Sequence, residues 1–478
     1  MAMRLHQNGG SSTSVMEMEL EPVYMSTAQS KQGVAVNDFT VHEPARQTSM
    51  ENGSGIDASD QDRSPLPPPS ISTDIVQRWN YPRKNIPRVA ACFWSFVVMG
   101  ANDAAYGALI PYIQAHYGLN YTVVSLIFLT PFVGYTAAAF LNNPIHLYLG
   151  QRGVAFICSG FHTLSYIIIA VHPPYPVLVI AFMLAGFGNG AADAAWNAWI
   201  GNMARANELL GILHGLYGVG AVLSPLVATT MITKGNLPWY TFYYVMIGMA
   251  VIDIAASVSC FWTATGSEYR ESLAKHSDSS KGSLREALFK RPAARVTWLC
   301  SLFLLGYVGI EVALGGWIVE FMIQVRQGEA FASGMAATGF WLGLTIGRFV
   351  LGFITPRIGE KRAIMIYLPV TMGLELLFWL VPQFIVSAVA VGLQGFFIGP
   401  LFPAAIVAVS KLLPRHLHVG AIGFAAAFGS SGAAVLPFVV GLIAQAQGVQ
   451  VLQPIILALL GVILMFWCGL PRIGKKME

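Results

Sequence analysis

The sequence predicts an all-α membrane protein with twelve transmembrane helices, and three observations support this prediction. Of the 478 residues, 55% are hydrophobic and only 11% are charged, whereas soluble domains carry about 25% charged residues. Apolar runs long enough to cross a bilayer recur along the chain. These runs are apolar on every face, so they do not alternate as the strands of a membrane barrel do. The composition therefore excludes a soluble surface.

The first 88 residues form a polar tail that carries eight of the 28 Lys and Arg residues. The tail is rich in Ser, Gly, Gln, Asp and Pro, and it includes the stretch SPLPPPS from Ser64 to Ser70. Too few large apolar residues are present to offset the entropy of the chain. No basic start followed by an apolar run marks a signal peptide. We expect residues 1–88 to be disordered and cytosolic.

Twelve apolar stretches follow the tail, each bounded by Pro, Gly or charged residues. A spanning helix needs about 20 such residues. The stretches start near residues 89, 121, 153, 177, 208, 239, 294, 330, 361, 384, 417 and 450. The longest interruption contains REALFKRPAAR, which is compatible with a short amphipathic surface helix. The expected units are a first six-helix half (89–265), a cytosolic loop (266–293), a second half (294–470) and a cytosolic C-terminal tail (471–478).

The positions of Lys and Arg predict the orientation, because these residues accumulate on the cytoplasmic side of membrane proteins. With the N-terminus inside, the outer loops hold only Lys234 and Arg326. The inner segments hold Arg152, Arg205, seven residues of the central loop, Arg357, Lys361, Arg362, Lys411, Arg415, Arg472, Lys475 and Lys476. Both termini are therefore expected in the cytosol.

The two halves repeat with one constant offset. GANDAAYGALIP from Gly100 lies over GIEVALGGWIVE from Gly309, an offset of 209 positions. The same offset relates Gly150-Gln-Arg152 to Gly359-Glu-Lys361 and Gly190 to Gly399. Two parallel six-helix halves are the architecture of the major facilitator fold, in which the solute site lies between the halves.

Three further segments resemble that superfamily and groups within it. GRFVLGFITPRIGEKR, from Gly347 to Arg362, resembles the signature loop of the superfamily, although Thr355 or Pro356 stands at its acidic position. The resemblance implies a cytoplasmic gating loop made of Arg152, Arg348, Arg357, Lys361 and Arg362. The alternative is that these residues are positive-inside anchors.

Helix 4 is more specific. GFGNGAADAAWNAWIGN, from Gly186 to Asn202, resembles the fourth helix of fucose/proton symporters, and Asp193 and Asn197 fall on its carboxylate and Asn positions. Asn102 and Asp103 precede Pro111 in helix 1, but the carboxylate of that family lies nearer the proline. Over residues 89–470 the chain resembles fungal facilitator proteins of the bypass-of-stop-codon type, through GANDAAYGALIPYIQAHYGL, NELLGILHGLYGVGAVLSP and GFFIGPLFPAA.

Buried acids are the candidates for proton coupling, because a charge at the bilayer centre costs at least about 2.5 kcal/mol. Asp193, Glu311 and Asp103 belong to helices that line the central cavity of this fold. Asp253 and Glu375 belong to more peripheral helices and are discounted. The alternative for Asp193 is a structural role, hydrogen bonded to His214 or Asn102.

Polar and aromatic residues on the same helices are the candidates for binding the solute. Asn189, Asp193 and Asn197 are four residues apart and share one helix face. His214 and Tyr217 are three apart, although a lone His in a membrane helix often serves as an interhelical hydrogen-bond partner. The full set of candidates is Asn102, Asn189, Asn197, Trp196, His214, Tyr217, Trp341 and Gln394.

These features predict a secondary transporter, not an enzyme. We expect proton-coupled alternating access for a small organic solute, either sugar-like or a metabolite that the cell makes. The alternatives are an exporter of a fungal secondary metabolite and a membrane sensor that binds solute without moving it. The lack of a Walker motif excludes an ATP-driven pump. We expect no metal, cofactor or nucleic-acid partner, and a monomer embedded in the lipid bilayer of the plasma membrane.

Overall fold

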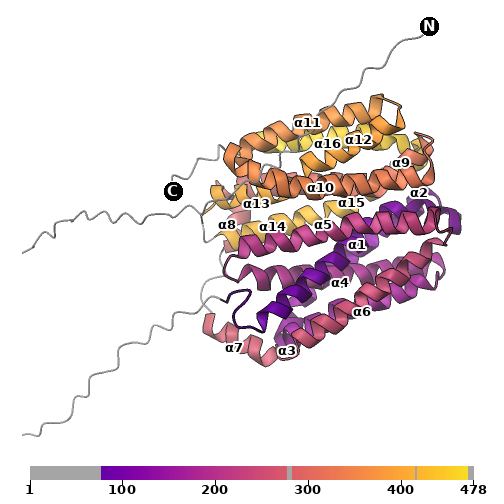
Figure 1. The fold of residues 1–478 in the computed structure, drawn as a ribbon. Coiled ribbons are helices and arrows are strands. Elements are labelled where there is room, and N and C mark those ends of the chain that lie inside the picture. The colour runs from indigo at the N-terminus through magenta and orange to yellow at the C-terminus, as the bar shows by residue number, and fades with distance from the viewer. Residues whose placement is uncertain (1–76, 277–282, 415–416, 472–478) are drawn as a thin grey trace, which may run out of the picture. The chain divides into compact units, whose positions relative to one another are not determined.

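A computed structural model describes residues 77–276, 283–414 and 417–471. Most of the predicted N-terminal tail lies outside these residues, as does most of the C-terminal tail. The described residues belong to one compact unit, residues 73–478. Within the described part of the chain, every regular element is a helix (Figure 1).

The first half is built from six helical passes. Its longest element, Leu126–Ala170, contains a break at Gly150, where the backbone has φ 70° and ψ −168°. This break divides one continuous helix into two passes. The elements are α1 (Asn85–Tyr117), α2 (Tyr121–Val124), α3 (Leu126–Ala170), α4 (Tyr175–Gly201), α5 (Ala206–Thr233), η1 (Trp239–Thr241) and α6 (Phe242–Cys260).

The second half repeats this order after two short helices, α7 (Gly266–His276) and α8 (Ser283–Phe289). Its fourth and fifth passes are each interrupted, between α12 and α13 and between α14 and α15. The elements are α9 (Ala293–Gln324), α10 (Ala330–Ile358), α11 (Glu360–Leu380), α12 (Phe384–Ile398), α13 (Leu401–Leu412), α14 (His418–Ser430), α15 (Gly432–Gln447), η3 (Val449–Val451) and α16 (Leu452–Gly469).

The number of membrane passes agrees with the sequence-based count. Among the described residues, ten helical stretches are long and apolar enough to cross a membrane. These ten treat Tyr121–Ala170 as one stretch and do not include α1. With α1 added and the long stretch divided at Gly150, the structure is consistent with twelve passes.

The repeat is visible in local backbone geometry. Gly150 and its counterpart Gly359 both have positive φ, 70° and 92°. Gly118 and its counterpart Gln327 also share the left-handed region, with φ 62° and 53°. These residues follow equivalent helices in the two halves, so the same turns recur 209 positions apart.

Basic side chains close the last helix of each half in equivalent ways. Arg88 Nε donates to the Cys260 carbonyl at 3.0 Å, at the end of α6. Arg295 Nη2 donates to the Gly469 carbonyl at 3.1 Å, at the end of α16. Lys361 Nζ donates to the Leu470 carbonyl beside it. Cations at these positions pair with the free carbonyl groups at the helix end, and they interact favourably with the negative end of the helix dipole.

The halves meet through α1 with α9, α5 with α10, and α15 with α2 and α3 (Figure 1). The Cα of Gly107 lies against the backbone of α9, since a Cβ at Gly107 would come within 1.9 Å of the Gly315 carbonyl oxygen. Glycines allow helix backbones to approach this closely.

Both hydrogen bonds that join the halves, among the described residues, start from Tyr121. Its hydroxyl donates to Glu320 Oε1 at 3.0 Å, and its backbone N–H donates to Gln445 Oε1 at 2.9 Å. Tyr121 lies where α1 joins α2, and we call this end of the bundle the Tyr121 end. The halves are therefore sealed at the Tyr121 end.

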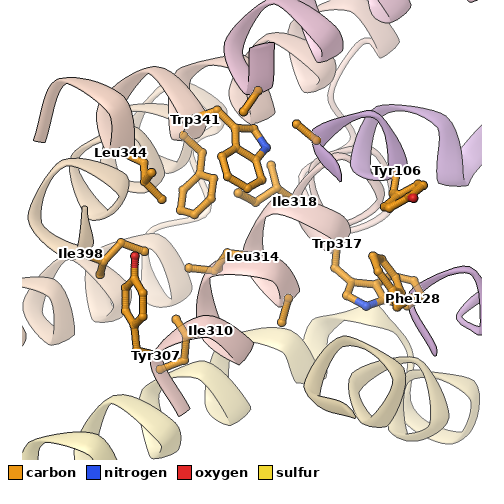
Figure 2. Packing of buried hydrophobic residues seen from close by; sticks show 14 of the residues in the cluster. Tyr106, Phe128, Tyr307, Ile310, Leu314, Trp317, Ile318, Trp341, Leu344 and Ile398 are labelled. Carbon is orange, nitrogen blue, oxygen red and sulfur yellow. The ribbon is translucent and has the colours of Figure 1, made fainter. Parts of the chain in front are cut away.

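Aromatic packing completes this seal. Figure 2 shows Trp317 of α9 beside Phe128 of α3, and their ring centroids are 6.0 Å apart. The Trp317 indole N–H donates to the Pro437 carbonyl at 2.9 Å, so its polar atom is satisfied. Because α9 carries these buried side chains against both halves, it is the central element of the core.

Candidate functional site

Polar side chains that lie between the two halves form the candidate site. They come from α1, α4 and α5 of the first half and from α9 and α10 of the second. In an otherwise apolar bundle each of them needs a hydrogen-bond or ionic partner, because burying an unpaired polar group is costly. The partners they choose indicate what the site can do.

Asp103 of α1 is the centre of the first-half group. Asn189 Nδ2 of α4 donates to Asp103 Oδ1 at 2.7 Å, and Asn102 Nδ2 donates to the same oxygen at 3.0 Å. The Tyr217 hydroxyl of α5 donates to Asp103 Oδ2 at 2.9 Å. Asn102 also donates to the Tyr106 hydroxyl at 2.9 Å. Three donors on three helices thus converge on one carboxylate, which suits its ionised form.

Asp193 lies on α4, one helical turn after Asn189. Asn197 Nδ2 donates to Asp193 Oδ1 at 2.7 Å, and the Tyr135 hydroxyl is a second partner. His214 Nε2 of α5 lies 3.1 Å from Asn197 Oδ1. His214 is an exposed residue, whereas Asn197 is half-buried. The structural alternative for Asp193 assumed a direct hydrogen bond from His214. In the structure His214 contacts Asn197 instead.

Glu311 of α9 forms an ion pair with Arg348 of α10. Arg348 Nη2 lies 2.9 Å from Glu311 Oε1, and their side chains are only 20% and 8% exposed. Arg348 lies ten residues before the end of α10, so it lies within the helix and not in the loop that the sequence motif had suggested. Its charge neutralises Glu311.

The polar residues around Asp103 and Asp193 in the first half face the Glu311–Arg348 ion pair of the second half. The charge of Arg348 acts on His214, and the charges of Glu311 and Arg348 both act on Tyr217. The structure therefore brings together Asp103, Asn102, Asn189, Tyr217, His214, Glu311 and Arg348, with Asp193 and Asn197 adjoining. Most of the polar residues that the sequence singled out are in this set.

Three other predicted residues lie elsewhere. Trp196 is fully buried within the first half, where its ring stacks on Phe261 at 4.7 Å. Gln394 is fully buried and donates to Glu375 Oε2 of α11 at 2.5 Å. Trp341 packs against the backbone of Gly315 in α9; Figure 2 shows its ring near Ile318 of the same helix. Its indole N–H has no partner among the described residues.

The predicted gating residues have different positions. The Arg152 backbone N–H donates to the Ala264 carbonyl at 3.0 Å, and its side chain lies over the Trp262 ring. Lys361 caps the end of α16, as described above. Arg357 and Arg362 are exposed at the ends of α10 and α11. Arg152 and Lys361 thus bind within their own halves.

Sequence reasoning did not single out one neighbour of the site, His162, and the structure gives the surroundings of Asp253, which was discounted. His162 of α3 is fully buried, and its Nε2 lies 2.8 Å from Asn189 Oδ1. Asp253 of α6 is fully buried within the first half and accepts hydrogen bonds from Ser95, Ser159 and Ser257 at 2.5, 2.6 and 3.0 Å. A polar residue in the middle of an apolar run is the available signal for both.

The site has the groups needed to bind a proton and a polar solute. Within the described ranges, no group of three or more His, Cys, Asp or Glu residues is arranged to hold a metal ion. Carboxylate, amide, phenol and imidazole groups offer both donors and acceptors to a hydroxylated molecule.

Comparisons with known proteins agree with this architecture. The family model described as Major Facilitator Superfamily matches residues 92–334 and 313–477. The chain is 29% identical over 489 aligned residues to Bypass of stop codon protein 6 from Saccharomyces cerevisiae, covering 93% of this chain and 97% of the yeast protein.

A second relative is the glucose/mannose transporter GlcP of Bacillus subtilis, 23% identical over 72% of this chain and 85% of that protein. The fold is similar to the crystal structure of the transporter FucP in the outward conformation, with a TM-score of 0.56 and 16% identity. That match covers 80% of this chain and 99% of FucP.

Proposed function

Because the chain belongs to the Major Facilitator Superfamily, we propose that it moves a small polar organic solute across a membrane by alternating access, driven by protons. The relative named as a glucose/mannose transporter supports a sugar-like solute. The exposed His214, together with half-buried Asn197 and Tyr217, offers hydrogen bonds that such a solute could exchange for water.

The observation that supports proton coupling is the contrast between the acids at the interface. Glu311 is held in an ion pair with Arg348. Asp103 and Asp193 have no basic partner within ion-pair distance among the described residues. The charges of the two aspartates also interact, and two nearby carboxylates disfavour simultaneous ionisation. Asp103 and Asp193 are therefore better proton carriers than Glu311.

The seal at the Tyr121 end supports one assignment of the conformational state. By the positive-inside prediction, the Tyr121 end faces away from the cytosol. The state would then be closed outward and accessible from the cytosol. The exposure of His214 on α5 is consistent with such access.

The test is uptake of a panel of labelled hexoses and polyols into proteoliposomes under an imposed pH gradient. Asp103→Asn and Asp193→Asn keep side-chain size and remove the titratable proton. Both should lose gradient-driven accumulation while retaining exchange of solute at equal concentrations on the two sides. Asp253→Asn is the matched control, because Asp253 is buried among serine hydroxyls within the first half.

Two results would contradict the proposal. One is normal accumulation, with normal pH dependence, in both well-expressed aspartate variants. The other is binding without flux across the whole panel, which would identify a sensor.

A further inference from the structure

A line of three side chains leads from Asp103 into the interior of the first half. Asn189 Nδ2 donates to Asp103 Oδ1 at 2.7 Å, and Asn189 Oδ1 lies 2.8 Å from His162 Nε2. Asn189 is 2% exposed and His162 is fully buried. His162 therefore contacts Asp103 only through the amide of Asn189.

The chemistry of the amide fixes the direction of these hydrogen bonds. An Asn side chain donates from its nitrogen and accepts at its oxygen. Since the nitrogen faces Asp103, the oxygen faces His162, and His162 must carry its hydrogen on Nε2. His162 is the one donor to this oxygen among the described residues. Its Nδ1 is buried without a partner.

Turning the amide over would favour the other protonation state of Asp103. The Asn189 oxygen would then face Asp103, where it could accept a hydrogen bond only from the protonated carboxyl. The Asn189 nitrogen would face His162 Nε2–H, placing two donors together. The turned amide would be accepted only if the His162 hydrogen moved to Nδ1, where it would be a buried donor without an acceptor. His162 therefore opposes the turned amide.

We propose that His162 is a positioning residue for the proton site: by donating to Asn189 it holds the amide toward ionised Asp103, and so sets the pH at which Asp103 releases its proton. This inference rests on the proposed function, specifically on Asp103 as a proton carrier. It adds a residue of α3 that touches neither the solute site nor the reacting carboxyl.

The other titratable groups near Asp103 and His162 do not hold the Asn189 amide in place. Glu311 and Arg348 face the cluster from the second half and neutralise each other. The groups that act on Asp103 or His162 from within the first half are Tyr106, Tyr135, Tyr166, Asp193, Tyr217 and Asp253. The charge of Asp253 is satisfied by three serine hydroxyls, and none of these groups donates to Asn189 Oδ1.

The experiment is the pH profile of proton-driven uptake in three variants. His162→Phe keeps a ring beside Tyr166, on which His162 stacks at 5.8 Å, but it donates nothing to Asn189. Its profile should move to more alkaline pH by about one unit, as expected for losing a hydrogen bond that favours the charged form. His162→Gln can donate an N–H to Asn189 Oδ1, but its own amide can also turn and accept from Asn189, so its profile should move less than that of His162→Phe.

His146→Leu is the matched control, because His146 is also a buried histidine of α3, yet it bonds to the Asn142 carbonyl of its own helix at 2.9 Å. Its profile should not move. If His162→Phe does not fold, His162→Leu gives the same test with a smaller side chain.

An unshifted profile in a folded His162→Phe or His162→Leu protein would overturn the proposal. Equal shifts in the Phe and Gln variants would also overturn it, because they would indicate packing and not hydrogen-bond donation. Failure of the premise looks different: Asp103→Asn would then still accumulate solute under a pH gradient, whatever the His162 variants do.

Discussion

The buried carboxylates of this bundle differ in what surrounds them. Asp253 is satisfied by three hydroxyls, Glu311 by a guanidinium, and Asp103 by two amides and a phenol. Asp103, Asp193 and Glu311 could be singled out from the sequence because each interrupts an apolar run. Their partners could not, since Arg348 lies in a motif that suggested a loop and pairs with a residue 37 positions away.

Glu375 and Gln394 form a buried pair whose contribution to stability can be tested. It accepts one hydrogen bond from Gln394, while Glu375 Oε1 and Gln394 Oε1 are buried without partners. A donor at position 375 would satisfy both amide atoms of Gln394. Glu375→Gln supplies that donor and should leave the melting temperature unchanged or raise it.

The comparison variant is Gln394→Leu, which leaves the Glu375 carboxyl buried with no partner and should destabilise the protein by about 2 kcal/mol. Both are measured by thermal unfolding of the detergent-solubilised protein. A larger loss of stability in Glu375→Gln than in Gln394→Leu would contradict this account.

At the scale of elements, the repeat predicted from sequence extends to the turns and the helix caps. The offset of 209 relates Gly150 to Gly359 and Arg152 to Lys361. Arg152 bonds just beyond the end of α6 in the first half, and Lys361 bonds at the end of α16 in the second. The sequence predicted the repeat because turns and anchors keep their residue types. It could not show that Lys361 caps α16 or that Arg152 bonds to the segment after α6, because the accepting carbonyls carry no sequence signal.

The two glycines should respond differently to the same substitution. Both have positive φ combined with an extended ψ of −168° and 133°, a conformation that costs an L-residue about 1–3 kcal/mol. A Cβ at Gly150 would also lie 2.3 Å from the Thr265 carbonyl carbon, whereas a Cβ at Gly359 meets nothing within 4 Å. Gly150→Ala should therefore lower the melting temperature clearly more than Gly359→Ala. Equal losses would show that backbone strain alone determines the cost.

At the scale of the whole molecule, the halves are joined by hydrogen bonds at the Tyr121 end alone, within the described residues. The internal repeat in the sequence predicted two halves and a site between them. It could not predict which end is closed, because under the proposed alternating access one sequence must support both closed ends.

Tyr121→Phe tests the seal, since it removes the hydroxyl that donates to Glu320 and keeps the ring against Trp317 at 5.9 Å. We expect spin labels on Asn120 and Gln450 to show a larger population of long distances in this variant. Tyr117→Phe is the control, because the Tyr117 hydroxyl bonds to Pro173 within the first half. An unchanged distance distribution in Tyr121→Phe would show that apolar packing alone holds the seal.

The contact of Gly107 with α9 has a mechanical consequence. Gly107 lies 22 residues from the start of α1 and ten from its end, or about 33 Å and about 15 Å along the helix. If the halves rock about this backbone contact, α1 acts as a lever with unequal arms. A rotation of about 10° would then move the Asn85 end of α1 by about 6 Å and the Tyr117 end by less than half as much. A small opening at the sealed end would accompany a large closure at the other.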